Sequence, residues 1–442
     1  SREQTLRLLD DRDPAVRLTA VRSLAQQEAQ PRASLSRDVN NHIHTVYSFS
    51  PYSPSRAVWE ALGAGLATAG IMDHDTVAGA AEFREAGRLL GLPVTAGAEL
   101  RVSFAGTPIA DRRINNPDQE GVAYLAFHGV PAPQFDAVDR FFRPVRAARG
   151  ERNRVMALRL DRMARDIGIT LDYDRHVLPL SEAARGGSVT DRHLLYALGV
   201  QLMRGLPDRS SWPGLLRDRW GLVPGEKAVR RLTDPSNSDV LYDLLGIFKA
   251  ELLPAVYEPA TDELVPVRTA LDFAASHSII AAYPYLGDVG ESVTGDKKAQ
   301  RFEDAYLEEL FVLLADLGVR AVTYMPSRNT PAQLDRLRSL CVRYGMFEIS
   351  GEDINQPRQS FVCEAMRDPL FANLYDAAWA LIGHEQLATQ DLRLGLFAEQ
   401  TVRQRPDLNE RIAFYRDQAL AGYRPSQASP EGETIQGGNN HD

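Results

Sequence analysis

Short apolar runs alternate with longer amphipathic segments over much of the chain, and this rhythm predicts strands and helices in turn. Strand-like runs at 37–44, 65–75 and 92–99 are separated by helix-like segments at 55–63 and 77–90. The rhythm returns near residue 265, with further helices and strands predicted at 270–276, 279–283, 301–317, 319–324, 331–344 and 346–350. Strand–helix units with short joins are typical of a parallel sheet, so we predict an α/β barrel.

Between and around these units the pattern changes, which divides the chain into six parts. Asp13 followed by Pro14 is a favourable helix start near the N-terminus, whereas the last residues are rich in Gly, Ser, Asn and acid. We predict an N-terminal helical extension (1–36), a first part of the barrel (37–108), a mainly helical insertion or cap (109–264), a second part of the barrel (265–365), C-terminal helices (366–425) and a disordered tail (426–442).

Composition narrows the class of protein. The 442 residues suffice for two or three units that each bury a core, and 44% hydrophobic with 25% charged residues is ordinary for a globular chain. A net charge of −9 argues against a general nucleic-acid-binding surface. No apolar run is long enough to span a bilayer and no signal peptide opens the chain, so we expect a cytoplasmic protein without a membrane partner. The two cysteines lack metal or disulfide spacing.

Polar side chains able to bind metal stand at the ends of the first three strand-like runs. His42 and His44 are two residues apart, so in a strand they point to the same face. The second run ends in Asp73-His74-Asp75, and the third ends in Glu99. Because the ends of parallel barrel strands gather at one mouth, we expect a site for a divalent transition metal there.

These motifs carry a family resemblance. The H-x-H-T of residues 42–45, the D-H-D of residues 73–75 and the G-x-E that ends at Glu99 resemble the PHP (polymerase and histidinol phosphatase) superfamily of metal-dependent phosphoesterases. The resemblance continues at residues 190–194, 281–284 and 349–355. It implies a distorted (β/α)7 barrel, here with a mainly helical insertion and helical N- and C-terminal extensions.

The resemblance also implies the ligands of one or two divalent ions (Mn, Zn or Fe). A first ion would be held by His42, His44, Glu99 and Asp353, and a second by Glu99 and His193. His128 is a further candidate for the second ion, and a structural histidine is the alternative there. The family's third metal would lose its ligands, because Phe49, Tyr283 and Asn355 stand where a ligand is expected.

Catalytic and substrate-binding candidates follow the strand ends. Asp73 and Asp353 are candidates to orient or deprotonate water, and His74 is a candidate to protonate the leaving oxygen. Arg328, Arg358 and Lys298 follow successive strand ends and are candidate ligands for a phosphate group or another anion.

Three functions remain open from the sequence. The first is metal-dependent hydrolysis of a small, anionic phosphoester by activated water. The second keeps the metal site but hydrolyses a C–N bond, as an amidohydrolase does. The third is a degenerate, non-catalytic protein that binds metal or ligand, for which Phe49, Tyr283 and Asn355 are the evidence. The oligomeric state is not indicated.

Overall fold

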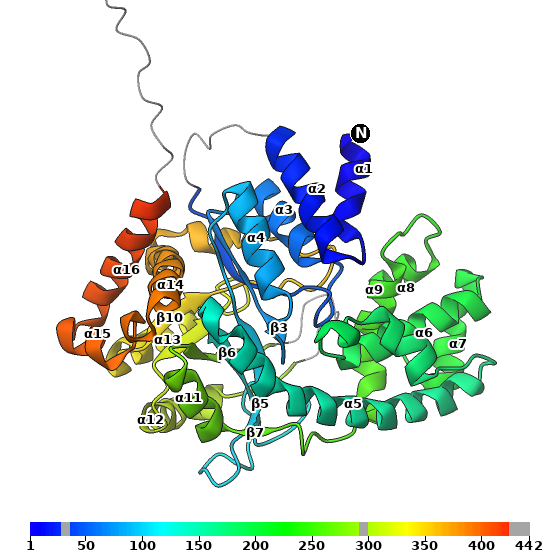
Figure 1. Cartoon of the computed structure of the whole chain (residues 1–442). Helices are drawn as coiled ribbons and strands as arrows, with labels where there is room; N and C mark the ends of the chain where they lie inside the picture. The colour runs from blue at the N-terminus through cyan, green and yellow to red at the C-terminus, as the bar shows by residue number, and fades with distance from the viewer. Residues whose placement is uncertain (28–35, 291–298, 424–442) are drawn as a thin grey trace, which may run out of the picture.

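A computed structural model describes residues 1–27, 36–290 and 299–423 of the chain, and Figure 1 shows their arrangement. Strands and most helices form one body, and helices α6 to α9 form a separate lobe to its right in that view. The long helix α5 (Phe135–Arg165) runs from the sheet region into this helical lobe. The predicted tail and Lys298 lie outside the described residues.

The strands form two sheets in which parallel pairing dominates. The three-stranded sheet has the order β1 (Val39–Ile43), β2 (Thr68–Ile71) and β4 (Val94–Thr95), and all its pairs are parallel. The seven-stranded sheet has the order β10-β9-β8-β6-β5-β3, with β7 beside β5. Its members are β3 (Asp73–His74), β5 (Ala98–Ser103), β6 (Val122–His128), β7 (Val265–Pro266), β8 (Ile280–Pro284), β9 (Ala321–Tyr324) and β10 (Phe347–Ser350). The predicted mixed α/β class is therefore confirmed.

One strand departs from the predicted parallel arrangement. β6 runs antiparallel to both β5 and β8, and it lies in the range 109–264, which is otherwise mainly helical. No helix separates β5 from β6, so the chain turns back and forms the adjacent antiparallel strand instead of crossing over the sheet. β6 thus joins the first group of strands to the second.

The first and last strand regions meet through an isolated parallel bridge between Ile43 and Ile354. The His44 amide donates to the Ile354 carbonyl (2.9 Å), and the Ile354 amide donates to the His42 carbonyl (3.1 Å). Gly351 makes the close approach feasible, because a Cβ there would lie 2.6 Å from Cβ of His42. The two sheets are therefore linked beside the histidine pair.

Helices between the strands begin and end where local chemistry favours it. Helix α3 (Pro54–Gly63) has Ser53 as its N-cap, and α4 (Ala80–Leu90) ends at Gly91 with φ 67°. Helix α13 (Pro331–Tyr344) has a capping box formed by Thr330 and Gln333. The remaining helices of this part are α11 (Val267–Ser276) and α12 (Leu307–Asp316).

The sheet region and the helical lobe each bury a large apolar cluster. The main core includes Phe83, Leu100 and Phe311. Helix α2 (Pro14–Gln27) adds Val21 and Leu24 to this core, and the turn that connects it to α1 (Arg2–Arg7) adds Leu9. The lobe core includes Trp212 and Phe248. The lobe comprises α6 (Asp191–Gly205), α7 (Trp212–Trp220), α8 (Glu226–Thr233), α9 (Val240–Ile247), a π-helical turn η7 (Phe248–Leu252) and α10 (Leu253–Val256).

The C-terminal helices cover the sheet region on the left of Figure 1. They are α14 (Ala372–Gln390), α15 (Glu399–Gln404) and α16 (Leu408–Tyr423). Leu381 and Tyr415 of α14 and α16 pack with Ile280 and Phe347 of the sheet. Among the described helices, none has both the length and the apolar character needed to cross a bilayer.

Candidate metal centre

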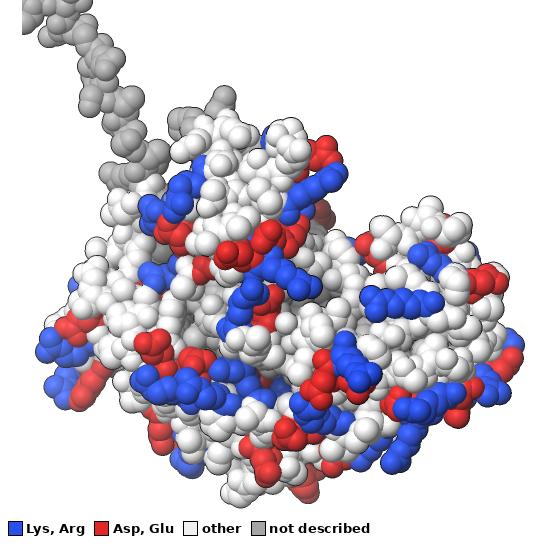
Figure 2. All heavy atoms as spheres, turned by 45° about the vertical axis from the view of Figure 1, so that its right-hand side comes forward, with Lys and Arg blue, Asp and Glu red and all other residues white. Residues whose placement is uncertain are grey.

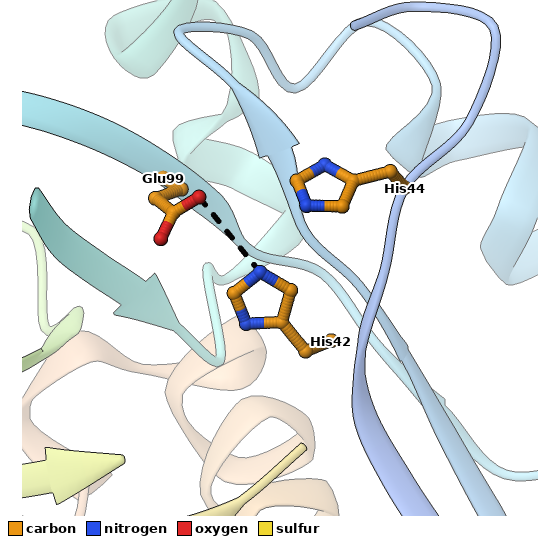
Figure 3. Close-up of side chains that lie close together, drawn as sticks. All are labelled: His42, His44 and Glu99. Atoms are coloured by element: carbon orange, nitrogen blue, oxygen red, sulfur yellow. Dashed lines mark ion pairs between the residues drawn. The ribbon is translucent and has the colours of Figure 1, made fainter. Parts of the chain in front are cut away.

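Three side chains from two strand ends converge in the sheet region. Ligand atoms of His42, His44 and Glu99 all lie within 4.8 Å of one another, and all three residues are buried. Figure 3 shows the two imidazoles and the carboxylate turned toward one another, with His42 Nε2 3.8 Å from Glu99 Oε2. This cluster can hold a metal ion.

The protonation and hydrogen bonding of His42 and Glu99 favour the binding of a cation between them. His42 Nε2 is buried and has no hydrogen-bond partner among the described residues. Burial and the neighbouring His44 charge lower the pKa of His42 to about 4, which keeps its imidazole in the neutral, metal-binding form. Burial raises the pKa of Glu99 to about 8, although His44 opposes this shift. A cation between them would satisfy the orphaned nitrogen and stabilise the ionised carboxylate.

Asp353 and His74 border the cluster on two sides. Asp353 Oδ1 lies 3.1 Å from His44 Nε2, and 40% of the Asp353 side chain stays exposed. His74 Nδ1 lies 3.3 Å from Glu99 Oε2, and its ring stacks on His44 with centroids 4.8 Å apart. Asn355 donates to Asp353 Oδ1 (2.7 Å), so it orients this carboxylate.

Asp73 lies behind His44 and supports it. Its carboxylate accepts hydrogen bonds from the Thr45 amide (2.7 Å), the Thr45 hydroxyl (2.6 Å) and the Ser48 hydroxyl (2.6 Å). Ser48 Oγ in turn lies 3.2 Å from His44 Nδ1. Because the Ser48 hydroxyl donates to Asp73, its oxygen accepts from Nδ1–H of His44, which leaves Nε2 as the nitrogen directed to the cluster.

The other two predicted histidines lie outside this three-residue group. His128 is buried, and its Nε2 has no partner among the described residues. Burial and the charge of His42 lower the pKa of His128 to about 3. His193 instead caps helix α6, because its Nδ1 accepts from the Thr190 amide (3.0 Å). The proton of the neutral ring then resides on Nε2, and the ring edge packs on Phe49 with centroids 5.1 Å apart.

Phe49, which stands where the resemblance expects a ligand, has an unusual backbone. Its φ is 111°, a region that bulky residues rarely adopt. Its ring packs against Tyr196 and Tyr242 of the helical lobe, with centroids 5.6 and 6.2 Å away. Phe49 therefore couples the loop after β1 to the lobe.

The two predicted substrate-binding arginines that the structure describes, Arg328 and Arg358, contact different parts of the protein. Arg328 Nε donates to the Leu286 carbonyl (3.2 Å). Burial lowers the pKa of the Arg328 guanidinium, although the nearby Glu303 and Asp353 carboxylates oppose this shift. Arg358 is instead directed to the helical lobe, where it pairs with Asp239 and Asp243.

The sequence motifs gave no role to the helix that links the lobe to the cluster. Arg149 of α5 is buried and binds the Asp75 carboxylate (2.5 Å). Arg146 donates to the Asp75 carbonyl (2.9 Å). Asp75 belongs to the D-H-D motif that is evident in the sequence. Arg146 and Arg149, its partners, lie in a predicted helical segment that contains no motif, so the sequence offered no signal for them.

Comparisons with known proteins give structural likenesses only. No protein-family model matches the chain, and no curated protein matches it. A solved structure of a candidate metal-dependent phosphoesterase from Bifidobacterium adolescentis is similar, with 18% identity, TM-score 0.47 and coverage of 78% of this chain and 98% of that one. An amidohydrolase from Chromobacterium violaceum, solved with sulfate and no metal, is also similar, with 16% identity, TM-score 0.49 and coverage of 74% and 90%.

Proposed function

We propose that this chain is a metal-dependent hydrolase of a small, anionic phosphoester. The observation that carries the proposal is the buried His42 Nε2, which has no partner among the described residues and lies beside His44 and Glu99, with the partly exposed Asp353 next to them. His42, His44, Glu99 and Asp353 would hold the first ion, and manganese, zinc and iron suit this mixture of imidazole and carboxylate. When bound, such an ion would act as a Lewis acid on a phosphoryl oxygen and on water.

The chain's own groups would prepare the reaction. The Asp73–Ser48 pair holds His44 in one orientation. Asp353 is accessible to solvent and would accept a hydrogen bond from the attacking water. His74 faces Glu99 through Nδ1, so Nε2 is the nitrogen left for proton transfer to the leaving oxygen. Arg328 would offset negative charge on the substrate.

A second ion is supported less directly. His193 would ligate through Nε2 only if Nδ1 carried the proton, which breaks its bond with the Thr190 amide. His128 needs no such change, because its Nε2 has no partner among the described residues. We therefore assign the second ion, if one binds, to Glu99 and His128 first.

The proposal also covers the role of Arg358 and the closure of the barrel. Arg358 would reach substrate only after leaving Asp243, so we assign it a role in holding the helical lobe. We also infer that the two sheets together form the distorted barrel of seven strand–helix units, closed through the Ile43–Ile354 bridge.

The test is turnover on phosphomonoesters, phosphodiesters and amides with added manganese, for the wild-type chain and for His44→Ala. We expect phosphoester turnover that His44→Ala abolishes and that His176→Ala, which lies outside the three-residue cluster, leaves unchanged. Turnover that survives His44→Ala would overturn the proposal. Turnover of amides alone would identify a C–N hydrolase, and metal binding without any turnover would identify a non-catalytic protein.

A further inference from the structure

Helix α9 of the helical lobe contacts both loops that carry side chains of the metal centre. Tyr242 and Asp243 are adjacent residues of this helix. The ring of Tyr242 packs against Phe49, with centroids 6.2 Å apart, and the carboxylate of Asp243 pairs with Arg358. Phe49 lies in the loop after β1, and Arg358 lies in the loop after β10. Two neighbouring side chains of one helix therefore hold the loop of the first strand and the loop of the last.

Phe49 is connected to His44 through its neighbour Ser48. The Phe49 amide donates to the Thr45 carbonyl (3.2 Å), which closes this part of the loop into a turn. The Ser48 hydroxyl lies 3.2 Å from His44 Nδ1 and donates to Asp73 (2.6 Å). A displacement of Phe49 would therefore move the oxygen that orients the imidazole of His44.

Contacts with the lobe keep Phe49 in a backbone conformation that a bulky residue disfavours. Its φ of 111° costs free energy, and such a conformation persists only where the surrounding structure holds it. The Phe49 side chain is buried against the rings of His193, Tyr196 and Tyr242, which all belong to the lobe. Docking of the lobe thus offsets the strain and keeps the loop in the shape that Ser48 requires.

Arg358 attaches the second loop to the start of α9. Its Nε lies 3.2 Å from Asp239 Oδ2, and its Nη2 donates to Asn237 Oδ1 (2.7 Å), in addition to the pair with Asp243. The Asp243 side chain is only 9% exposed, so water screens this pair less than it screens a surface ion pair. The guanidinium is therefore fixed by three side chains at one end of the helix.

Residues beside Arg358 extend this connection to Asp353. Gln359 Oε1 accepts from the Asn355 amide (2.7 Å), and the Asn355 side chain donates to Asp353 Oδ1 (2.7 Å). Asp353 Oδ1 is also the oxygen that lies 3.1 Å from His44 Nε2. The two loops thus meet at the metal centre, and α9 holds each of them from the lobe side.

We propose that helix α9 is a positioning element of the metal centre, so that binding of the ion and docking of the helical lobe stabilise each other. Tyr242 acts on the loop of His44, and Asp243 acts on the loop of Asp353. Because coupling between two sites is reciprocal, a contact of α9 that raises metal affinity is itself strengthened when the ion binds. This inference rests on the proposed function for its metal centre, and on none of the hydrolytic steps.

The first test is the manganese affinity of the full chain, measured by competition with a chromophoric chelator. We expect Arg358→Met to weaken this affinity about tenfold, because it releases the loop of Asp353 from α9. Arg159→Met is the matched control and should bind as the wild type does. Arg159 also pairs with a carboxylate, that of Glu258, and is equally exposed (38% against 37% for Arg358), but Glu258 lies outside both loops.

Two substitutions of Phe49 separate the loss of the ring from the strain in the backbone. Phe49→Ala removes the ring and leaves a residue that disfavours a φ of 111°, so the loop should relax and manganese affinity should fall about tenfold. Phe49→Gly also removes the ring, but glycine tolerates positive φ, so its affinity should fall less. A larger loss in Phe49→Gly than in Phe49→Ala would overturn the role of the strained backbone.

Hydrogen exchange tests the reciprocal effect without any measurement of turnover. Manganese should slow exchange of the α9 amides more than that of the α7 amides in the wild type, and Arg358→Met should reduce this difference. Circular dichroism verifies that each variant is folded.

The outcomes distinguish this inference from the proposed function. Unchanged manganese affinity in both Arg358→Met and Phe49→Ala would overturn the inference and leave the hydrolase intact. Manganese binding that weakens in both variants, in a chain without turnover, would refute the hydrolase and support the positioning role of α9. A chain that binds no manganese would overturn both.

Discussion

His44 and Asp353 contact each other (Nε2–Oδ1 3.1 Å), although one follows the first strand and the other follows the last. Burial alone would lower the pKa of His44, yet the nearby Asp353 carboxylate raises it. In the absence of a metal, this contact stabilises a charged imidazole. A cation at the cluster would compete with that proton for the same nitrogen.

Removing either histidine of the pair should therefore remove metal. We expect His42→Ala and His44→Ala to lose most bound manganese or zinc, because each deletes a nitrogen of the three-residue cluster. His176→Ala should keep wild-type metal content, since His176 accepts from the Asp172 amide and is not part of the three-residue cluster. Elemental analysis after gel filtration measures this, and full loading of His44→Ala would contradict the cluster as a metal centre.

Ser48→Ala should weaken metal binding without unfolding the protein. The substitution removes the oxygen that accepts from His44 Nδ1 and leaves Asp73 with its Thr45 bonds. Loss of such a supporting bond usually lowers metal affinity about 10- to 100-fold. Competition with a chromophoric chelator measures the affinity, with the exposed Ser339→Ala as control. Unchanged affinity in Ser48→Ala would show that Ser48 does not orient His44.

The N-terminal helices should contribute to stability through one buried ion pair. Arg17 on α2 binds Glu82 on α4 (Nη2–Oε2 2.5 Å), and both side chains are at least 95% buried. Arg17→Met would leave the Glu82 charge without its partner, at a cost of about 3–5 kcal/mol. Arg7→Met, which breaks the exposed pair with Glu3, should cost less than about 1 kcal/mol. Urea unfolding compares them, and equal losses would contradict the difference in burial.

Glu385 should make stability fall as pH rises. Burial raises the pKa of Glu385 to about 8 from its ordinary value of 4.5, although Arg84 and the Ala96 amide lower it. Between these two values the folded state binds a proton that the unfolded state lacks, so the free energy of unfolding decreases with pH. Glu385→Gln removes this contribution, and its stability relative to the wild type should increase from pH 5 to pH 8. A constant difference in urea midpoints over that range would contradict the shift.

The sequence predicted a helix most accurately where residues typical of both its start and its end were present. The helix predicted at 331–344 is Pro331–Tyr344, because Thr330 with Gln333 defines its start and Gly345 follows its end. The direction of β6 could not be read in this way. An alternating pattern fits a strand of either direction, and the direction depends on whether a crossover helix precedes it.

In the candidate site, too, local sequence patterns predicted some features, whereas others depend on the tertiary arrangement. The spacing of His42 and His44 predicted a shared face, and the structure brings both to Glu99. The pairing of Arg358 with Asp243 depends on how the lobe docks, which no local pattern records. His193 is an instructive case, because the Thr190-x-x-His193 spacing places it at the third position of a helix, where side chains cap backbone amides.

The Ile43–Ile354 bridge has a consequence for the order of biosynthesis. Because synthesis runs from the N-terminus, His42, His44 and Glu99 leave the ribosome well before Asp353, which lies 254 residues after Glu99. The complete ligand set therefore cannot exist on a short nascent chain. Ion uptake at full affinity would be a late event, and a truncated translation product would lack the open carboxylate that completes the centre.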